Sequence, residues 1–135
     1  MHAQQMKILI IEDHPDMREL LRLVLRSLDY LSIEARDGKE GIEKAISEKP
    51  ELILMDIRMP VMDGWQAVKV LRAHPETHDI PILATTALIR PHDLKACLEA
   101  GCSGYIVKPF GRLELQTKII ELLGDRRVRD SLVSH

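Results

Sequence analysis

The chain has 135 residues, of which 45% are hydrophobic and 30% are charged, and its formal net charge is −2 at pH 7. This length suits one domain, and the near balance of charge argues against nucleic-acid binding through a basic surface. No run approaches the roughly 18 apolar residues of a membrane span, and no signal peptide is visible, so we expect a cytoplasmic protein without membrane contact.

Short apolar runs alternate with longer amphipathic stretches along the chain. The apolar runs are Ile8–Ile11, Leu31–Ala35, Leu52–Met55, Ile82–Ala84 and Tyr105–Val107. Four of them are nearly continuous in apolar character, which is typical of strands covered on both faces. In the second run, Leu31, Ile33 and Ala35 alternate with polar residues, which predicts an edge strand with one face open to water.

The stretches between these runs carry apolar residues three or four positions apart, which predicts helices. The apolar sets are Met17, Leu20, Leu21, Val24 and Leu28, then Ile42, Ala45 and Ile46, then Ala67, Val68 and Leu71, then Leu94, Cys97 and Leu98, and finally Leu113, Ile120 and Leu123. We interpret all of them as core residues and expect Gly124 to end the last helix. Five repeats of strand and helix predict an α/β fold with a parallel sheet between two helical layers.

Polar residues stand at the ends of the predicted strands. Glu12 and Asp13 follow the first strand, Asp56 ends the third, Thr86 ends the fourth and Lys108 follows the fifth. Because ligands of open parallel sheets bind beyond the carboxyl ends of the strands, we expect these side chains to meet.

Three carboxylates at one edge of a sheet would repel one another unless a cation lay between them. Oxygen ligands favour Mg²⁺, and we expect that Mn²⁺ can substitute. A carboxylate nucleophile, a metal, an ammonium and a hydroxyl donor together suit the transfer of a phosphoryl group onto Asp56. Each residue alone is weak support, because an Asp at the end of a strand is more often a cap or turn residue.

Four sequence blocks resemble the signature blocks of bacterial response-regulator receiver domains. They are Ile10–Pro15, Met55–Gly64, Pro81–Ala87 and Tyr105–Phe110. The resemblance covers residues 6–124, which we take as the receiver domain, and leaves 125–135 as a short C-terminal tail. We expect a stand-alone, single-domain response regulator, and a piece cut from a longer protein remains the alternative.

The resemblance implies a flavodoxin-like, doubly wound five-stranded sheet with strand order 2-1-3-4-5. It also implies that Asp56 is the phosphoacceptor and that Asp13 binds the metal directly, with Glu12 acting mainly through water. Asp56 and the backbone carbonyl of Arg58 would complete the protein ligands of the metal.

Further roles are implied for residues near the fourth and fifth strands. Lys108 would contact a phosphoryl oxygen, Thr86 would be the switch hydroxyl and Tyr105 the switch aromatic residue. The bond between Lys108 and Pro109 resembles a cis peptide of the family. Phosphorylation would then change the face made by the fourth helix, the fifth strand and the fifth helix.

The implied function is a signalling switch that acts through protein contacts. A sensor histidine kinase or a phosphotransfer protein would donate the phosphoryl group, and an unknown downstream protein would bind the changed face. The chain would be a monomer or weak dimer, and it would catalyse only its own phosphorylation and dephosphorylation. It would therefore not be a multiple-turnover enzyme.

Three other functions fit this pattern of residues less well. A metal-dependent phosphatase or phosphotransferase often has its nucleophilic Asp at the end of the first strand and a second acid two residues later, whereas Glu12 and Asp13 are adjacent. A nucleotide or flavin binder would be expected to have a Gly-rich or hydroxyl-rich phosphate-binding loop after the first strand. A scaffold that has lost phosphorylation would not need these acids together with Thr86 and Lys108.

Residues in or beside the four blocks, and the two cysteines, are interpreted separately. We interpret His14, beside the acidic pair, as a surface residue rather than part of the rim of the site. Arg58 and Leu88 suggest slow self-dephosphorylation by limiting the approach of water, and the alternative is that both simply face solvent. Cys97 and Cys102 are interpreted as small core residues rather than redox groups.

Overall fold

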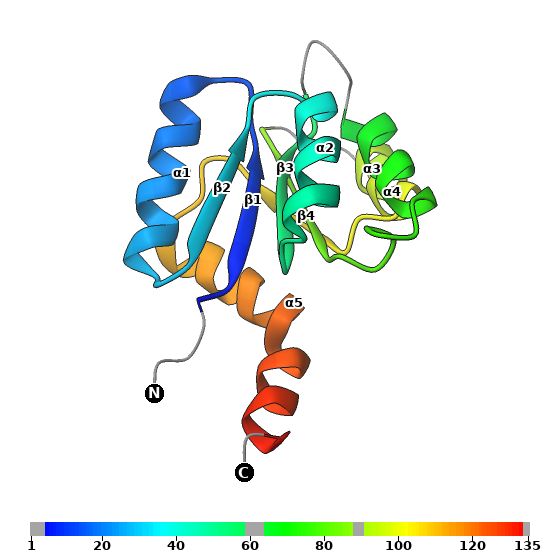
Figure 1. Ribbon diagram of the computed structural model, residues 1–135. Coiled ribbons are helices and arrows are strands. Elements are labelled where there is room, and N and C mark those ends of the chain that lie inside the picture. Colours follow the sequence, from blue (N-terminus) through cyan, green and yellow to red (C-terminus); the bar gives the residue numbers. More distant parts are fainter. Residues whose placement is uncertain (1–4, 59–63, 88–90, 134–135) are drawn as a thin grey trace.

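The computed structural model describes residues 5–58, 64–87 and 91–133 (Figure 1). Its strands form one parallel sheet in the order β2-β1-β3-β4-β5, which confirms the predicted fold class and strand order. The strands are β1 (Lys7–Ile11), β2 (Leu31–Ala35), β3 (Leu52–Asp56), β4 (Ile82–Thr86) and β5 (Gly104–Val107).

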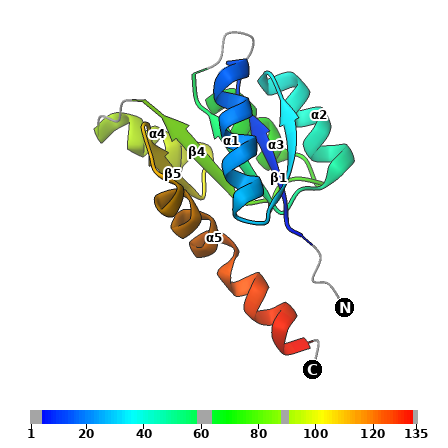
Figure 2. The same ribbon diagram turned by 90° about the vertical axis from the view of Figure 1, so that its left-hand side faces the viewer.

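Helices cover both faces of this sheet (Figures 1 and 2). They are α1 (Pro15–Ser27), α2 (Gly38–Glu48), α3 (Gly64–Ala73), α4 (Pro91–Ala100) and α5 (Arg112–Val133). Because successive strand residues point to opposite faces, Ile8 and Ile10 pack under α1 and α5, whereas Leu9 and Ile11 pack under α2, α3 and α4. The two halves of the core therefore share the central strands.

The two edges of the sheet are less covered than its centre. β2 lies at one edge and buries only Ala35 fully, as its alternating sequence predicts. β5 forms the other edge and buries only Ile106, while Val107 is exposed, so the expectation that this strand is covered on both faces is wrong. Apolar composition did not separate β5 from the central strands because an exposed side chain on an edge can still be apolar.

Four residues that were expected in the core are exposed instead: Leu20, Leu98, Leu113 and Ile120. In α5 the buried stripe is Leu115, Ile119 and Leu123, which are spaced four residues apart. Ile120 stands one position from Ile119, which is about 100° around a helix and turns its side chain off that stripe. The side chains of Leu94 and Cys97 lie outside the described part of the structure, and Cys102 is buried as expected.

The last helix does not end at Gly124. α5 continues through this glycine to Val133, and its final turns extend away from the sheet (Figure 2). A glycine inside a helix costs about 1 kcal/mol relative to alanine but still makes the backbone hydrogen bonds. Gly101, directly after α4, has a positive φ of 112°.

None of the helices in the described ranges combines the length and the apolar character that crossing a membrane requires.

Candidate functional site

The polar residues at the strand ends meet beyond the carboxyl edge of the sheet. Lys108 Nζ lies 3.1 Å from Glu12 Oε1 and 3.6 Å from Asp56 Oδ2. One ligand atom from each of Glu12, Asp13, His14 and Asp56 lies within 4.8 Å of the other three. The structure therefore brings together the three predicted carboxylates and the predicted cation, and it adds His14.

Backbone and side-chain contacts fix Glu12 at the end of β1. Its N–H donates to the carbonyl of Ala35 at 3.0 Å, which continues the pairing with β2. Its own carbonyl accepts a hydrogen bond of 2.9 Å from the guanidinium of Arg18, one turn into α1. Arg18 also lies 3.6 Å from the carboxylate of Glu34. Arg18 was not among the predicted site residues, although its position as the fourth residue of the helix that follows the acidic pair was a usable signal.

Asp56 is held at the end of β3 by its neighbours along the chain. Its Oδ1 accepts a 3.0 Å hydrogen bond from the backbone N–H of Arg58, and the next residue, Ile57, donates to the carbonyl of Thr85 at 3.2 Å. Gly64 donates to the carbonyl of Ile57 at 2.9 Å. A Cβ atom on Gly64 would lie 2.6 Å from the Cα atom of Ile57, so this close approach requires glycine.

The two buried carboxylates have opposite pKa shifts. Burial raises the pKa of Asp56 and, with a smaller contribution from the charge of Glu12, outweighs the opposing effects of the Arg58 N–H and of Lys108. Burial would also raise the pKa of Glu12, but the hydrogen bonds from the His14 N–H and from Lys108 outweigh it and hold this pKa below its usual value. Without a metal, Glu12 therefore carries the negative charge beside Lys108, and Asp56 is the group that is protonated first.

The donor set of the site fits a hard divalent cation. Glu12, Asp13 and Asp56 offer carboxylate oxygens, which are the ligands that Mg²⁺ prefers. Asp13 Oδ1 is buried and accepts no hydrogen bond within the described residues. A buried oxygen without a donor is unfavourable, and a cation between the carboxylates would satisfy it.

The remaining predicted residues lie on β4 and β5. Thr86 ends β4, and its carbonyl accepts a 2.7 Å hydrogen bond from the backbone N–H of Lys108. Tyr105 on β5 is half-buried against the core under α2, α3 and α4, and Lys118 Nζ lies 5.8 Å from the centre of its ring. The peptide bond between Lys108 and Pro109 is cis. The side chain of Arg58 is exposed, and Leu88 lies outside the described residues.

The sequence and the fold both match those of known signalling proteins. The family described as "Response regulator receiver domain" matches residues 8–120. An uncharacterized 14.6 kDa protein of Leptolyngbya boryana is 37% identical over 82% of this chain and 85% of its own length. The probable transcriptional regulator ycf27 of Porphyridium aerugineum is 38% identical over 93% of this chain, and the match covers 50% of the length of that regulator.

Two solved structures are similar over nearly their whole length. The chemotaxis protein CheY4 of Vibrio cholerae has a TM-score of 0.85 and 29% identity, covering 89% of this chain and 100% of its own. The receiver domain of a sensor histidine kinase from Pseudomonas aeruginosa has a TM-score of 0.84 and 36% identity, covering 90% of this chain and 99% of its own. That receiver domain contains a magnesium ion coordinated in its active-site cleft.

Proposed function

Because the chain belongs to the response regulator receiver domain family, we propose that it accepts a phosphoryl group on Asp56 from a phospho-histidine donor in a Mg²⁺-dependent reaction. The donor would be a sensor histidine kinase or a phosphotransfer protein. The observation that carries the proposal is the cluster of Glu12, Asp13 and Asp56 with Lys108 Nζ 3.6 Å from Asp56.

The metal would be held by the carboxylates of Glu12, Asp13 and Asp56 and by the backbone carbonyl of Arg58. The buried Oδ1 of Asp13, which accepts no hydrogen bond from the described residues, supports this assignment, as does the magnesium ion in the cleft of the Pseudomonas aeruginosa receiver domain. When bound, the ion neutralises the charge that builds up between these carboxylates and the incoming phosphoryl oxygens.

Asp56 acts as the nucleophile. One of its carboxylate oxygens bonds to phosphorus while the bond between phosphorus and the donor imidazole nitrogen breaks, and the electron pair of that bond leaves with the imidazole. The Arg58 N–H holds one oxygen of Asp56 at 3.0 Å and so helps to orient the carboxylate. Lys108, now paired with Glu12, is within reach to contact a phosphoryl oxygen.

Phosphorylation would change the switch face, which is the surface formed by α4, β5 and α5. Thr86 would move toward the new oxygens, and Tyr105 would take the space that Thr86 leaves. Exposed apolar side chains on all three elements support the assignment of this face to a protein partner: Leu98, Val107, Leu113 and Ile120.

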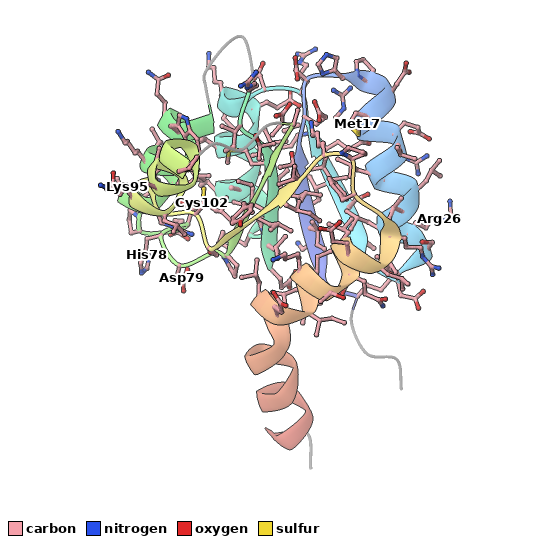
Figure 3. The ribbon with its side chains drawn as sticks, turned by 180° about the vertical axis from the view of Figure 1, so that it is seen from behind. Met17, Arg26, His78, Asp79, Lys95 and Cys102 are labelled. Atoms are coloured by element: carbon pink, nitrogen blue, oxygen red, sulfur yellow. The ribbon has the colours of Figure 1, made fainter. Side chains whose placement is uncertain are left out.

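Incubation with acetyl phosphate and Mg²⁺, followed by intact-mass analysis, tests the proposal. We expect one added phosphoryl group, lost on chelation of the metal and absent in Asp56→Asn. Asp79→Asn is the matched control, because Asp79 is an exposed aspartate in the loop before β4, at the opposite end of the sheet (Figure 3). Addition that persists in Asp56→Asn would refute Asp56 as the phosphoacceptor. Multiple turnover on a free phosphorylated substrate would instead favour a phosphatase.

A further inference from the structure

His14 occupies the N-cap position of α1 without capping the helix. Its backbone is extended, with φ −83° and ψ 116°, and its side chain makes no cap hydrogen bond. The imidazole faces the acidic cluster instead, where Nδ1 lies 3.2 Å from Asp13 Oδ1 and 3.3 Å from Glu12 Oε2. The ring position is therefore defined by the two carboxylates rather than by the helix.

The backbone supports this position of the ring. The His14 N–H donates to Glu12 Oε2 at 3.2 Å, so the main chain and the ring of His14 approach the same carboxylate oxygen. Pro15, the first residue of α1, follows directly, and a proline restricts the backbone of the residue before it. His14 is thus held beside the cluster by local geometry.

The spacing of these atoms suits neighbouring ligands of one metal ion. Ligands at adjacent corners of an octahedron with bonds of about 2.0 to 2.1 Å are about 2.8 to 3.0 Å apart, a few tenths of an ångström less than the spacing here. The distances from His14 Nδ1 to Asp13 Oδ1 and to Glu12 Oε2 are 3.2 and 3.3 Å. Asp13 Oδ1 is buried and accepts no hydrogen bond from the described residues, although His14 Nδ1 lies this close to it. The side chain of His14 is 73% exposed, which leaves room for water on the same ion.

We propose that His14 supplies an imidazole nitrogen to the metal of this site. With this ligand, the site prefers Co²⁺ over Mg²⁺ more strongly than a site made of the carboxylates alone. Imidazole favours later first-row metals, whereas Mg²⁺ takes oxygen ligands. The inference rests on the proposed function, because it concerns the same metal site.

Calorimetric titration of the full chain with Co²⁺ and with Mg²⁺ tests the preference. We expect His14→Asn to weaken Co²⁺ binding about tenfold or more and to change Mg²⁺ binding less than about threefold. Asparagine is a favoured N-cap residue, so this variant should fold. His78→Asn is the matched control, because His78 is an exposed histidine at the other end of the sheet (Figure 3). Equal weakening of both metals in His14→Asn would overturn the proposal.

Pulsed electron paramagnetic resonance of bound Mn²⁺ shows directly whether a nitrogen is a ligand. We expect nitrogen coupling in the wild type and in His78→Asn, and its loss in His14→Asn. Coupling that is absent from the wild type, or that persists in His14→Asn, overturns the role of His14. If Mg²⁺ binds and Asp56 is phosphorylated in that case, the proposed function stands and only this inference fails. Failure of the wild type to bind Mg²⁺ would instead refute both.

Discussion

At the scale of single residues, the site combines groups whose charges oppose folding in the absence of a metal. Asp56 is only 6% exposed and Glu12 only 1%, and Lys108 is the cation that contacts both. Burial, with a smaller contribution from the charge of Glu12, raises the pKa of Asp56 despite the nearby ammonium of Lys108. The burial of these charged groups therefore lowers the stability of the metal-free protein.

Replacing Asp56 with asparagine should stabilise the metal-free protein. We expect Asp56→Asn to raise the free energy of unfolding by about 1 to 2 kcal/mol at pH 7 in a chelator, measured by urea denaturation. Because the folded pKa is raised, the protonated form of Asp56 contributes stability below its unfolded pKa, and this contribution is lost as the pH rises through the folded pKa. The advantage of the variant should therefore shrink as the pH falls.

The Asp79→Asn variant provides the comparison for this measurement, since Asp79 is exposed and lies away from the carboxylate cluster. Asp79→Asn should change the free energy of unfolding little, both at pH 7 and at lower pH. A wild type and an Asp56→Asn variant of equal stability at pH 7 would contradict the account of charge repulsion.

At the scale of elements, β5 links the site to the surface. Lys108 follows this strand directly, and Tyr105 lies within it, opposite Ala84 in the register with β4. Lys118 of α5 lies over the Tyr105 ring, at a distance that allows a cation–π contact. A change in the position of Tyr105 would therefore reach α5 as well as β5.

Removing the ring of Tyr105 should separate phosphorylation from its effect on a partner. We expect Tyr105→Ala to accept a phosphoryl group at the wild-type level. The ratio of partner affinities with and without phosphorylation should be smaller than in the wild type by a factor of about five or more. Affinity for the isolated partner, measured with and without phosphodonor, provides the test. Leu31→Ala is a suitable control, because Leu31 is an exposed apolar residue on the opposite edge strand. Unchanged phosphorylation dependence in Tyr105→Ala would count against the switch face.

Sequence alone predicted the elements that depend on strand periodicity and failed for details that depend on packing. Asp56 and Lys108 could be located because the ends of parallel strands share one edge of the sheet. Ile120 was assigned to the core because adjacent positions on a helix are both apolar, and only the packing of α5 on the sheet decides which one is buried. Arg18 was missed, and His14 was interpreted as a surface residue, because residue spacing does not give the direction of a side chain near a helix start.

At the scale of the whole molecule, a second polar cluster holds the opposite end of the sheet. Arg72 of α3 donates from Nε to the carbonyl of Gly101 at 2.8 Å and from Nη1 to the carbonyls of His78 and Ile80 at 3.0 and 2.7 Å. Its Nη2 also donates to Ser103 Oγ at 3.3 Å. One guanidinium thus joins α3 to the loops before β4 and before β5.

Truncation of Arg72 should lower stability without altering the metal site. We expect Arg72→Met to lower the free energy of unfolding by about 2 to 4 kcal/mol, because it removes four hydrogen bonds and leaves carbonyls without donors. The affinity for Mg²⁺ should not change. Arg22→Met is the matched control, since Arg22 pairs with Glu19 on the exposed face of α1 and should leave the unfolding midpoint unchanged. Equal effects of the two variants would refute this role for Arg72.

The ion pair between Glu12 and Lys108 joins positions 96 residues apart in the sequence. Closing so long a loop is slow, and β5 must join the sheet before the pair can form. A cation that needs the completed site then binds the native chain but not its partly folded forms. We therefore infer that Mg²⁺ lengthens the lifetime of the folded protein by slowing its unfolding, while the rate of folding stays nearly the same.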